Sequence, residues 1–304
     1  MSDRLQVVSI VGPTAAGKTS LSLALAERFD AEIVNLDAYQ IYRGMDIGTA
    51  KPSAEDQARV RHHVIDVVDI DFNASVSDFQ VWAHAAIRNI NARGKLAICV
   101  GGSGLYVRAV LDELEIPATD PEVRQKYHDL LDERGGVWLH ALLAQRDPEA
   151  AALIVPGNSR RVVRALEVNE ITGKPFPAAI PEPTSMFRNV RIALAANRSD
   201  IADRITTRTR LMWDHGWADE VLALTARGLM STPTASKALG YKEVNQFNHG
   251  EISAEEAQAL ISSATVKFSK RQMQWFNRDA TNVWLEWNRP SLTADAVSIV
   301  SAAL

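Results

Sequence analysis

The chain has 304 residues, of which 46% are hydrophobic and 23% charged, with a formal net charge of -4 and a pI near 6.0. No apolar run approaches the roughly 20 residues of a membrane span and no signal peptide is visible, so we expect a cytoplasmic protein without a membrane partner. The single Cys99 excludes an internal disulfide and a cysteine-based zinc site. The acidic balance disfavours a nucleic-acid partner unless the basic residues gather on one face.

The first apolar run leads into a phosphate-binding loop. Val7–Val11 is typical of a buried strand, and the pattern G-x-x-x-x-G-K-[ST] follows it directly. Glycines let main-chain N–H groups converge on phosphate oxygens, a helix expected from about Lys18 directs its positive end at them, and Lys18 adds a full charge. Thr19 is the expected Mg²⁺ ligand. The loop residues are Gly12, Pro13, Thr14, Ala15, Ala16, Gly17, Lys18 and Thr19. Such a loop recognises a diphosphate or triphosphate end and leaves the rest of the ligand open.

Strands and helices then alternate along the chain. Asp37 comes just after the second expected strand, and a glycine loop, Gly101–Gly104, follows another and offers the Ser103 hydroxyl as a donor. A capping box at Ser75-x-x-Asp78 predicts the start of a helix. The expected strands are 7–11, 32–35, 63–67, 96–100, 190–194 and 282–286. This alternation predicts an α/β fold of the P-loop NTPase type, in which helices flank a parallel sheet and ligands lie at the carboxyl ends of its strands.

The pattern changes after residue 112. Between 121 and 171 the sequence is helical in character, with Asp147-Pro148 as a helix start and Gly173 as a stop. We therefore predict an all-helical insertion at 113–188, and an α/β core made of 1–112 and 189–304. Three further helices are expected in the core, beginning near Asp200, near Trp217 and after Ser253.

The helix after Asp200 places arginines on its apolar side. Arg204 and Arg208 share that side with Ile201 and Ile205. A guanidinium buried without a partner is too costly, so either structural carboxylates or a bound anion must meet these arginines. Because a phosphate loop is present elsewhere, we favour the anion for at least one of them.

Two other helices carry basic faces. At 159–168 the arginines lie opposite Val162, Val163 and Leu166, and no acidic neighbour is expected on their face; they suit either solvent or phosphate and base contacts. The arginines are Arg160, Arg161 and Arg164. After Ser253 a longer helix aligns a basic row that is flanked by Phe268 and Trp275, which favours a polynucleotide over a solvated face. The row consists of Lys267, Arg271, Gln274 and Arg278.

Several runs together resemble the bacterial tRNA dimethylallyltransferase (isopentenyltransferase) family, and the match extends along nearly the whole chain. The first runs are the phosphate loop, Asp37–Pro52 and Gly101–Tyr106, and the later ones are Arg161–Val168, Leu239–Glu243 and Lys270–Phe276. The resemblance implies transfer of a dimethylallyl group from its diphosphate to N6 of the adenosine 3′ of the anticodon, with diphosphate as leaving group. It implies Mg²⁺, tRNA gripped at its anticodon stem-loop by the insertion, and a target base flipped out of its stack.

The resemblance also implies the roles of individual residues. Those expected at the reaction centre are Asp37 as the catalytic carboxylate, Lys18, Thr19, Ser103 and Arg208. Those expected to contact tRNA are Asp37, Ala38, Tyr39, Gln40, Ser103, Arg124, Arg160, Arg161, Arg164, Lys267, Arg271 and Arg278. Two positions depart from the family pattern, since Ala38 replaces a common serine and Arg160 replaces a glutamine.

Two alternatives share parts of this pattern. A small-molecule kinase would share the P-loop and the fold but would need ATP, and an isopentenyltransferase acting on free adenine nucleotides would need neither the insertion nor the basic helix. We expect a monomer.

Overall fold

The computed structural model describes residues 6–179 and 182–304, and the chain forms two compact units. Unit 1 combines Met1–Glu113 with Pro183–Leu304, and unit 2 is Leu114–Glu182. Each unit has its own hydrophobic core and is described by itself.

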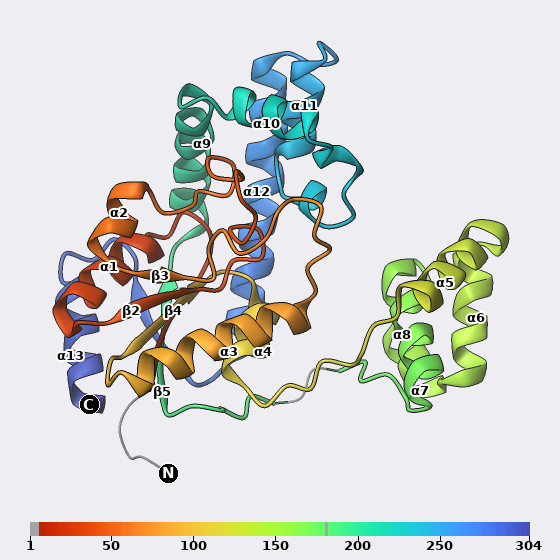
Figure 1. Cartoon of the computed structure of the whole chain (residues 1–304), viewed down its shortest axis with the longest axis horizontal. Coiled ribbons are helices and arrows are strands. Elements are labelled where there is room, and N and C mark those ends of the chain that lie inside the picture. Colours follow the sequence, from red (N-terminus) through yellow and green to blue (C-terminus); the bar gives the residue numbers. More distant parts are fainter. Residues whose placement is uncertain (1–5, 180–181) are drawn as a thin grey trace. The chain divides into compact units, whose positions relative to one another are not determined.

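Unit 1 is built on a six-stranded parallel sheet in the order β3-β2-β4-β1-β5-β6 (Figure 1). The strands are β1 (Val7–Val11), β2 (Glu32–Asn35), β3 (His62–His63), β4 (Ala97–Gly101), β5 (Asn189–Ala195) and β6 (Asn282–Glu286). Every strand pair is parallel, as the alternation of strands and helices predicts. The predicted P-loop type of α/β fold is confirmed.

Helices surround this sheet. They are α1 (Lys18–Phe29), α2 (Ala54–Arg59), α3 (Val76–Ala92), α4 (Gly104–Leu111), α9 (Arg198–Asp214), α10 (Trp217–Ala226), α11 (Tyr241–Asn248), α12 (Ala254–Phe276) and α13 (Leu292–Ala303), with short 3₁₀ turns at Leu229–Ser231 and Ala235–Lys237. The expected capping box at Ser75 is present, and a second one at Ser253 begins α12. Both satisfy main-chain N–H groups that a helix start leaves without partners.

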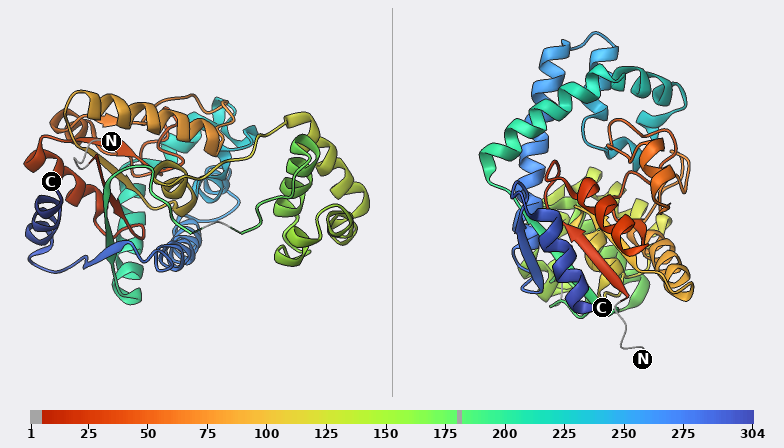
Figure 2. Two further views of the ribbon diagram at one scale, coloured as in Figure 1. Left: turned by 90° about the horizontal axis from the view of Figure 1, so that it is seen from below. Right: turned by 90° about the vertical axis from the view of Figure 1, so that its left-hand side faces the viewer.

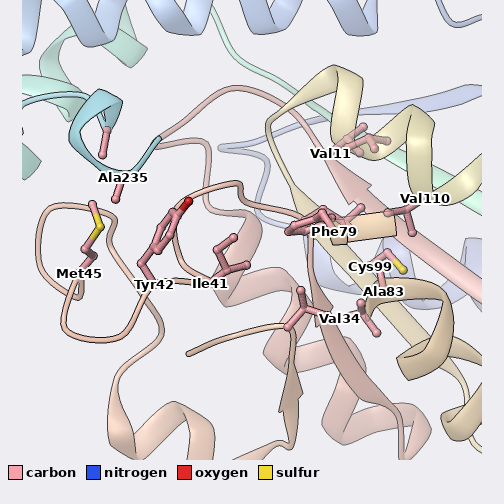
Figure 3. Close-up of a cluster of buried hydrophobic side chains, with 14 of the residues drawn as sticks. Val11, Val34, Ile41, Tyr42, Met45, Phe79, Ala83, Cys99, Val110 and Ala235 are labelled. Atoms are coloured by element: carbon pink, nitrogen blue, oxygen red, sulfur yellow. The ribbon is translucent and has the colours of Figure 1, made fainter. Parts of the chain in front are cut away.

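The two faces of the sheet bury different side chains because successive residues of a strand point to opposite sides. On one face, Val7 and Val11 belong to the same cluster as Phe79 and Ala83 of α3 (Figure 3). On the other, Val8 and Ile10 pack with α1 and α13. The views in Figure 2 show helices on both sides of the sheet. Strands covered on both faces are continuously apolar, which is why they were visible in the sequence.

The structure corrects several boundaries. The strand expected at 63–67 is only His62–His63, because Val64 and Asp66 adopt left-handed backbone conformations with φ of 62° and 52°. The α2, α11 and α13 helices were not predicted. Of these, α2 and α11 have only 6 and 8 residues, so each is too short to show a clear helical period in the sequence.

Unit 2 consists of four helices in its described residues, and all four lie in the stretch predicted to be helical. They are α5 (Pro121–Arg134), α6 (Gly136–Arg146), α7 (Pro148–Leu153) and α8 (Ser159–Thr172). Tyr127, Leu139 and Leu166 are fully buried among them. Asp147 caps α7 by accepting the amide of Ala150 at 3.0 Å, as the Asp-Pro pair predicts.

Candidate active site

Three loops meet at the carboxyl edge of the sheet in unit 1. Val11 at the end of β1 is in register with Gly101 at the end of β4, and Val100 is in register with Asn35 at the end of β2. The P-loop, Asp37 and Ser103 follow these strand ends directly. The parallel topology thus brings together the residues that the sequence predicts at the reaction centre.

The P-loop has the conformation that its glycines permit. Gly12 has φ of 138°, and a Cβ there would lie 2.9 Å from the carbonyl oxygen of Leu194 on β5. Gly17 is left-handed at φ 87° and precedes α1, which begins at Lys18. The Lys18 Nζ folds back over the loop and donates to the carbonyls of Gly12 at 3.0 Å and Pro13 at 2.7 Å. The lysine is held over the place where a phosphate would bind.

Burial and nearby charges shift the pKa values of Lys18, Asp37 and Arg208. Burial, and then the guanidinium of Arg208, lower the pKa of Lys18 from 10.5 to about 7, although Asp37 acts to raise it. Burial raises the pKa of Asp37, and this outweighs the amide of Tyr39 and the two cations. Burial also lowers the pKa of Arg208. Two cations therefore lie close to a single carboxylate, which cannot neutralise the charge of both. The positive charge that remains favours binding of an anion.

Two arginines of α9, Arg204 and Arg208, contact the P-loop. Arg208 Nη1 donates to the Thr14 hydroxyl at 3.2 Å, and Arg204 Nε donates to the Ala15 carbonyl at 2.6 Å. The Arg204 guanidinium also lies 4.2 Å above the ring of Trp287. Within the described residues neither arginine forms a salt bridge. Arg204 is exposed and Arg208 is half-buried, and an anion as the partner of either arginine stays a prediction.

Asp37 is held by the chain around it. Its amide donates to Asn35 Oδ1 at 2.9 Å, and its own Oδ1 accepts the amide of Tyr39 at 2.9 Å. Asn35 also donates to the carbonyl of Val64 at 2.9 Å, which ties the end of β2 to the loop after β3. One carboxylate oxygen is thus oriented by the main chain, and a raised pKa makes the group a better proton acceptor once it is ionised.

The segment after Asp37 is fixed by a residue that was missed from the sequence. Glu220 on α10 accepts the amides of Asp46, Ile47 and Gly48 at 2.9, 2.6 and 3.1 Å, and the Tyr241 hydroxyl at 2.7 Å. One carboxylate therefore satisfies three successive amides of the loop. The three amides are 172 to 174 residues away from Glu220, so spacing in the sequence offered no means of finding them.

The other predicted residues of this segment take part in the same framework. Gln40 donates from Nε2 to the carbonyls of Thr49 and Ala50, both at 3.1 Å, so its Oε1 is the acceptor that remains. Tyr39 donates from its hydroxyl to the carbonyl of Lys237 at 3.1 Å. Ala38 is half-buried between Asp37 and Tyr39. Ile41, Tyr42 and Met45 are buried beneath them, and Figure 3 shows Tyr42 and Met45 beside Ala235.

Ser103 precedes α4 and is half-buried. In the part of the chain that the structure describes, its hydroxyl makes no capping bond to that helix, so it remains able to donate to a ligand. The Trp275 ring, expected beside the basic row of α12, lies against Gly104, with its Cδ1 2.1 Å from where a Cβ of that residue would be. Lys267 and Arg271 are exposed on α12, whereas Arg278 of the predicted row is exposed in the turn after that helix, which ends at Phe276.

In unit 2 the predicted arginines have partners that the sequence analysis overlooked. Glu167 is fully buried and accepts from Arg124 and from Arg164, each at 2.8 Å. Arg161 donates to the carbonyl of Ala178, and Arg160 is exposed. The expectation that this helical face lacks acidic neighbours is wrong, because Glu167 lies one turn after Arg164. Burial raises the pKa of Glu167, but Arg164, the amide of Asp120 and Arg124 together lower it by more. The pKa of Glu167 therefore lies below its ordinary value.

Thr19 is exposed in the first turn of α1, where a metal ion bound to a phosphate could reach its hydroxyl. Among the described residues no group of three or more histidine, cysteine, aspartate or glutamate side chains could hold a metal. A Mg²⁺ ion here would depend on ligand phosphate oxygens and water, as is usual for this ion.

No helix in the described part of the chain is long and apolar enough to span a membrane.

These loops can be compared with those of known proteins. A family model described as IPP transferase matches residues 40–279. The chain belongs to the IPP transferase family. It is 48% identical over 297 residues to a tRNA dimethylallyltransferase of Salinispora arenicola, which covers 98% of this chain and 87% of the relative. The membership predicted from the sequence runs is confirmed, and the chain is an enzyme of the transferase class.

Two solved structures support the IPP transferase fold. A tRNA isopentenylpyrophosphate transferase from Bacillus halodurans is 36% identical, with a TM-score of 0.73 and coverage of 99% of this chain and 97% of that one. A eukaryotic dimethylallyltransferase acting on tRNA has a TM-score of 0.83 at 24% identity, covering 97% and 79%. The second similarity supports the fold alone.

Proposed function

We propose that this protein transfers a dimethylallyl group from dimethylallyl diphosphate to N6 of the adenosine 3′ of the anticodon in tRNA. The observation that carries the proposal is the convergence of a P-loop, two arginines without carboxylate partners among the described residues, and Asp37 at one sheet edge. A P-loop alone would serve many reactions. The similarity to named tRNA dimethylallyltransferases selects among them.

The chemistry suits these residues. The allylic C–O bond of the donor breaks, positive charge develops on carbon, and negative charge develops on the departing diphosphate. Lys18, the loop amides and Arg208 would stabilise that diphosphate. A new bond forms between the allylic carbon and N6, and Asp37 takes the proton that N6 loses. Ser103 would donate a hydrogen bond to a substrate from beside this centre.

Mg²⁺ belongs to the proposal. The Thr19 hydroxyl would hold it together with diphosphate oxygens and water, and the ion would help to neutralise the leaving group. Burial and the guanidinium of Arg208 lower the pKa of Lys18 to about 7, and a metal ion would add to the positive charge that meets the two phosphates.

Unit 2 and the outer face of α12 are the proposed tRNA contacts. Exposed Arg160, Lys267, Arg271 and Arg278 offer cations to the phosphate backbone of the anticodon stem-loop. Arg124, Arg161 and Arg164 are included with their internal partners in place, since a guanidinium has five N–H donors and a carboxylate or carbonyl leaves some of them available. A monomeric, cytoplasmic enzyme is part of the same proposal.

Incubation with dimethylallyl diphosphate, Mg²⁺ and unmodified tRNA, followed by nucleoside analysis, tests the proposal. We expect N6-dimethylallyladenosine at the position 3′ of the anticodon, with equimolar diphosphate released. Prenylation of adenosine monophosphate but not of tRNA would favour an adenylate isopentenyltransferase. Phosphate transfer from ATP to a small acceptor would favour a kinase.

A further inference from the structure

The glycine loop after β4 is packed against the inner face of α12. A Cβ built on Gly102 would lie 2.3 Å from Nε2 of Gln272, and one built on Gly104 would lie 2.1 Å from Cδ1 of Trp275. Atoms cannot approach so closely, so these two positions must lack a side chain for α12 to pack here. Gly102 and Gly104 are therefore explained by contact with a helix.

The Gln272 amide joins this loop to the P-loop. Its Oε1 accepts the amide of Thr14 at 2.9 Å, and its Nε2 donates to the carbonyl of Gly102 at 3.0 Å. Both partners are main-chain groups, and they determine which end of the side-chain amide is oxygen and which is nitrogen. The side chain is 6% exposed, so water competes little for either bond.

Both bonds end beside residues of the proposed reaction centre. Thr14 also accepts Arg208 at its hydroxyl, and Gly102 directly precedes Ser103. A shift of either loop by about 1 Å would misplace groups that must meet the diphosphate and the acceptor base, and such a shift can cost about 10²-fold in rate. An amide is the neutral side-chain group that offers an acceptor and a donor at once in this space.

We propose that Gln272 is a positioning residue for the transfer reaction, which it serves by holding the P-loop and the Ser103 loop in one fixed relation. This inference rests on the proposed function. Gln272 touches neither reacting atom and acts through Thr14 and Gly102.

Two substitutions separate positioning from packing. Gln272→Met keeps nearly the same volume and loses both hydrogen bonds. Gln272→Glu keeps the shape, and its carboxylate can accept from Thr14 but cannot donate to Gly102. When the carboxyl group of this variant is protonated, it again offers one donor and one acceptor. Burial raises the pKa of a carboxyl group and so favours this protonated form. The charged groups around the P-loop are Lys18, Asp37, Arg204 and Arg208. All four are present in the wild type and in each variant, so rates are expressed relative to wild type at each pH.

The experiment measures single-turnover transfer to unmodified tRNA between about pH 5.5 and about pH 8.5, with thermal unfolding and tRNA affinity measured beside it. We expect both variants to lose roughly 10²-fold in rate at pH 8 with tRNA affinity unchanged. Gln272→Glu should regain about tenfold relative to wild type at the acid end, and Gln272→Met should regain nothing. Gln258→Glu, near the start of the same helix, should match wild type throughout.

Each outcome decides the inference. A Gln272→Met rate within twofold of wild type, or a Gln272→Glu rate without the acid recovery, would reduce Gln272 to a packing role. If Gln272→Met does not fold, the acid recovery of Gln272→Glu decides, because it is measured within one protein. A wild type that transfers nothing to tRNA would overturn the proposed function and this inference with it, whereas an active wild type with unaffected variants would overturn the inference alone.

Discussion

Arg204 and Arg208 of α9 and the arginines of unit 2 were both considered as anion contacts from the sequence, but they have different partners in the structure. Arg204 and Arg208 contact a carbonyl and a hydroxyl of the P-loop. Arg124 and Arg164 share one buried carboxylate, Glu167. An arginine with a buried carboxylate contributes to the stability of its unit, whereas one that faces a phosphate loop without a carboxylate is ready for an anion that arrives later.

Whether an arginine binds a ligand or supports the structure therefore depends on its partner and not on the arginine itself. Changes in the first region should alter reaction rate with little effect on stability. Changes in the second should alter stability first. The following predictions test that division, beginning with the largest expected effect.

Asp37 acts electrostatically on Arg208 but is not its ion-pair partner in the described structure. Asp37→Asn keeps the shape and cannot take the proton from the adenine amine, so single-turnover transfer should fall by about 10² to 10⁴. Donor and tRNA affinities and the unfolding temperature should change little. Rapid-quench measurements of the single-turnover rate, together with thermal unfolding, test this. Transfer at nearly the wild-type rate would show that Asp37 is not the proton acceptor.

Arg208→Ala should lower the transfer rate by about 10² to 10³, because it removes a preorganised donor from the developing diphosphate charge. Stability should hold, since no buried carboxylate loses a partner. Arg210→Ala, two residues later and exposed, is the matched control and should transfer normally. A large loss of stability in Arg208→Ala with normal catalysis would place this arginine in the structural class.

Glu167→Gln should destabilise unit 2 by about 1 to 3 kcal/mol, because Arg124 and Arg164 lose the charge that they share. Hydrogen exchange of peptides from 121–171 should accelerate, while exchange around the P-loop should not. The exposed Glu149→Gln in the same unit serves as control. If exchange in 121–171 is unchanged, Glu167 does not have the structural role assigned to it.

The pH dependence of stability gives a second test of the structural role of Glu167. The folded pKa of Glu167 lies below its unfolded value of 4.5, so its contribution is fully present above about pH 4.5 and is lost as pH falls through the lower folded pKa. The difference in stability between wild type and Glu167→Gln should therefore be constant at neutral pH and should shrink below about pH 4.5. A difference that grows on acidification would contradict the assignment.

The smallest expected effect concerns Arg271 on the exposed face of α12 and Arg278, two residues beyond the end of that helix. Arg271 and Arg278 form no salt bridge within the described residues, so each is available to a phosphate. Each lost contact should reduce the slope of log tRNA affinity against log salt by roughly 0.7 to 0.9. Arg59, which pairs with Glu27 at 2.8 Å, is the control. An unchanged slope in the Arg271→Ala, Arg278→Ala double variant would remove this helix from the tRNA contact surface.

Local chemistry was readable in the sequence wherever it involves neighbouring residues. The P-loop, the cap of α3 at Ser75 and the position of Asp37 after β2 all follow from short-range patterns. The parallel sheet follows from the order of its elements. Glu167, one turn after Arg164, was equally close at hand, and it was missed because the helical face was judged by its arginines alone.

What tertiary structure alone could decide is which distant groups meet. Glu220 reaches amides more than 170 residues away, Gln272 reaches Thr14 across 258 residues, and Trp275 packs on Gly104. Main-chain amides are identical at every position, so a sequence does not reveal which of them a side chain will bind. Only the packing of α10 and α12 against the loops at the sheet edge selects those partners.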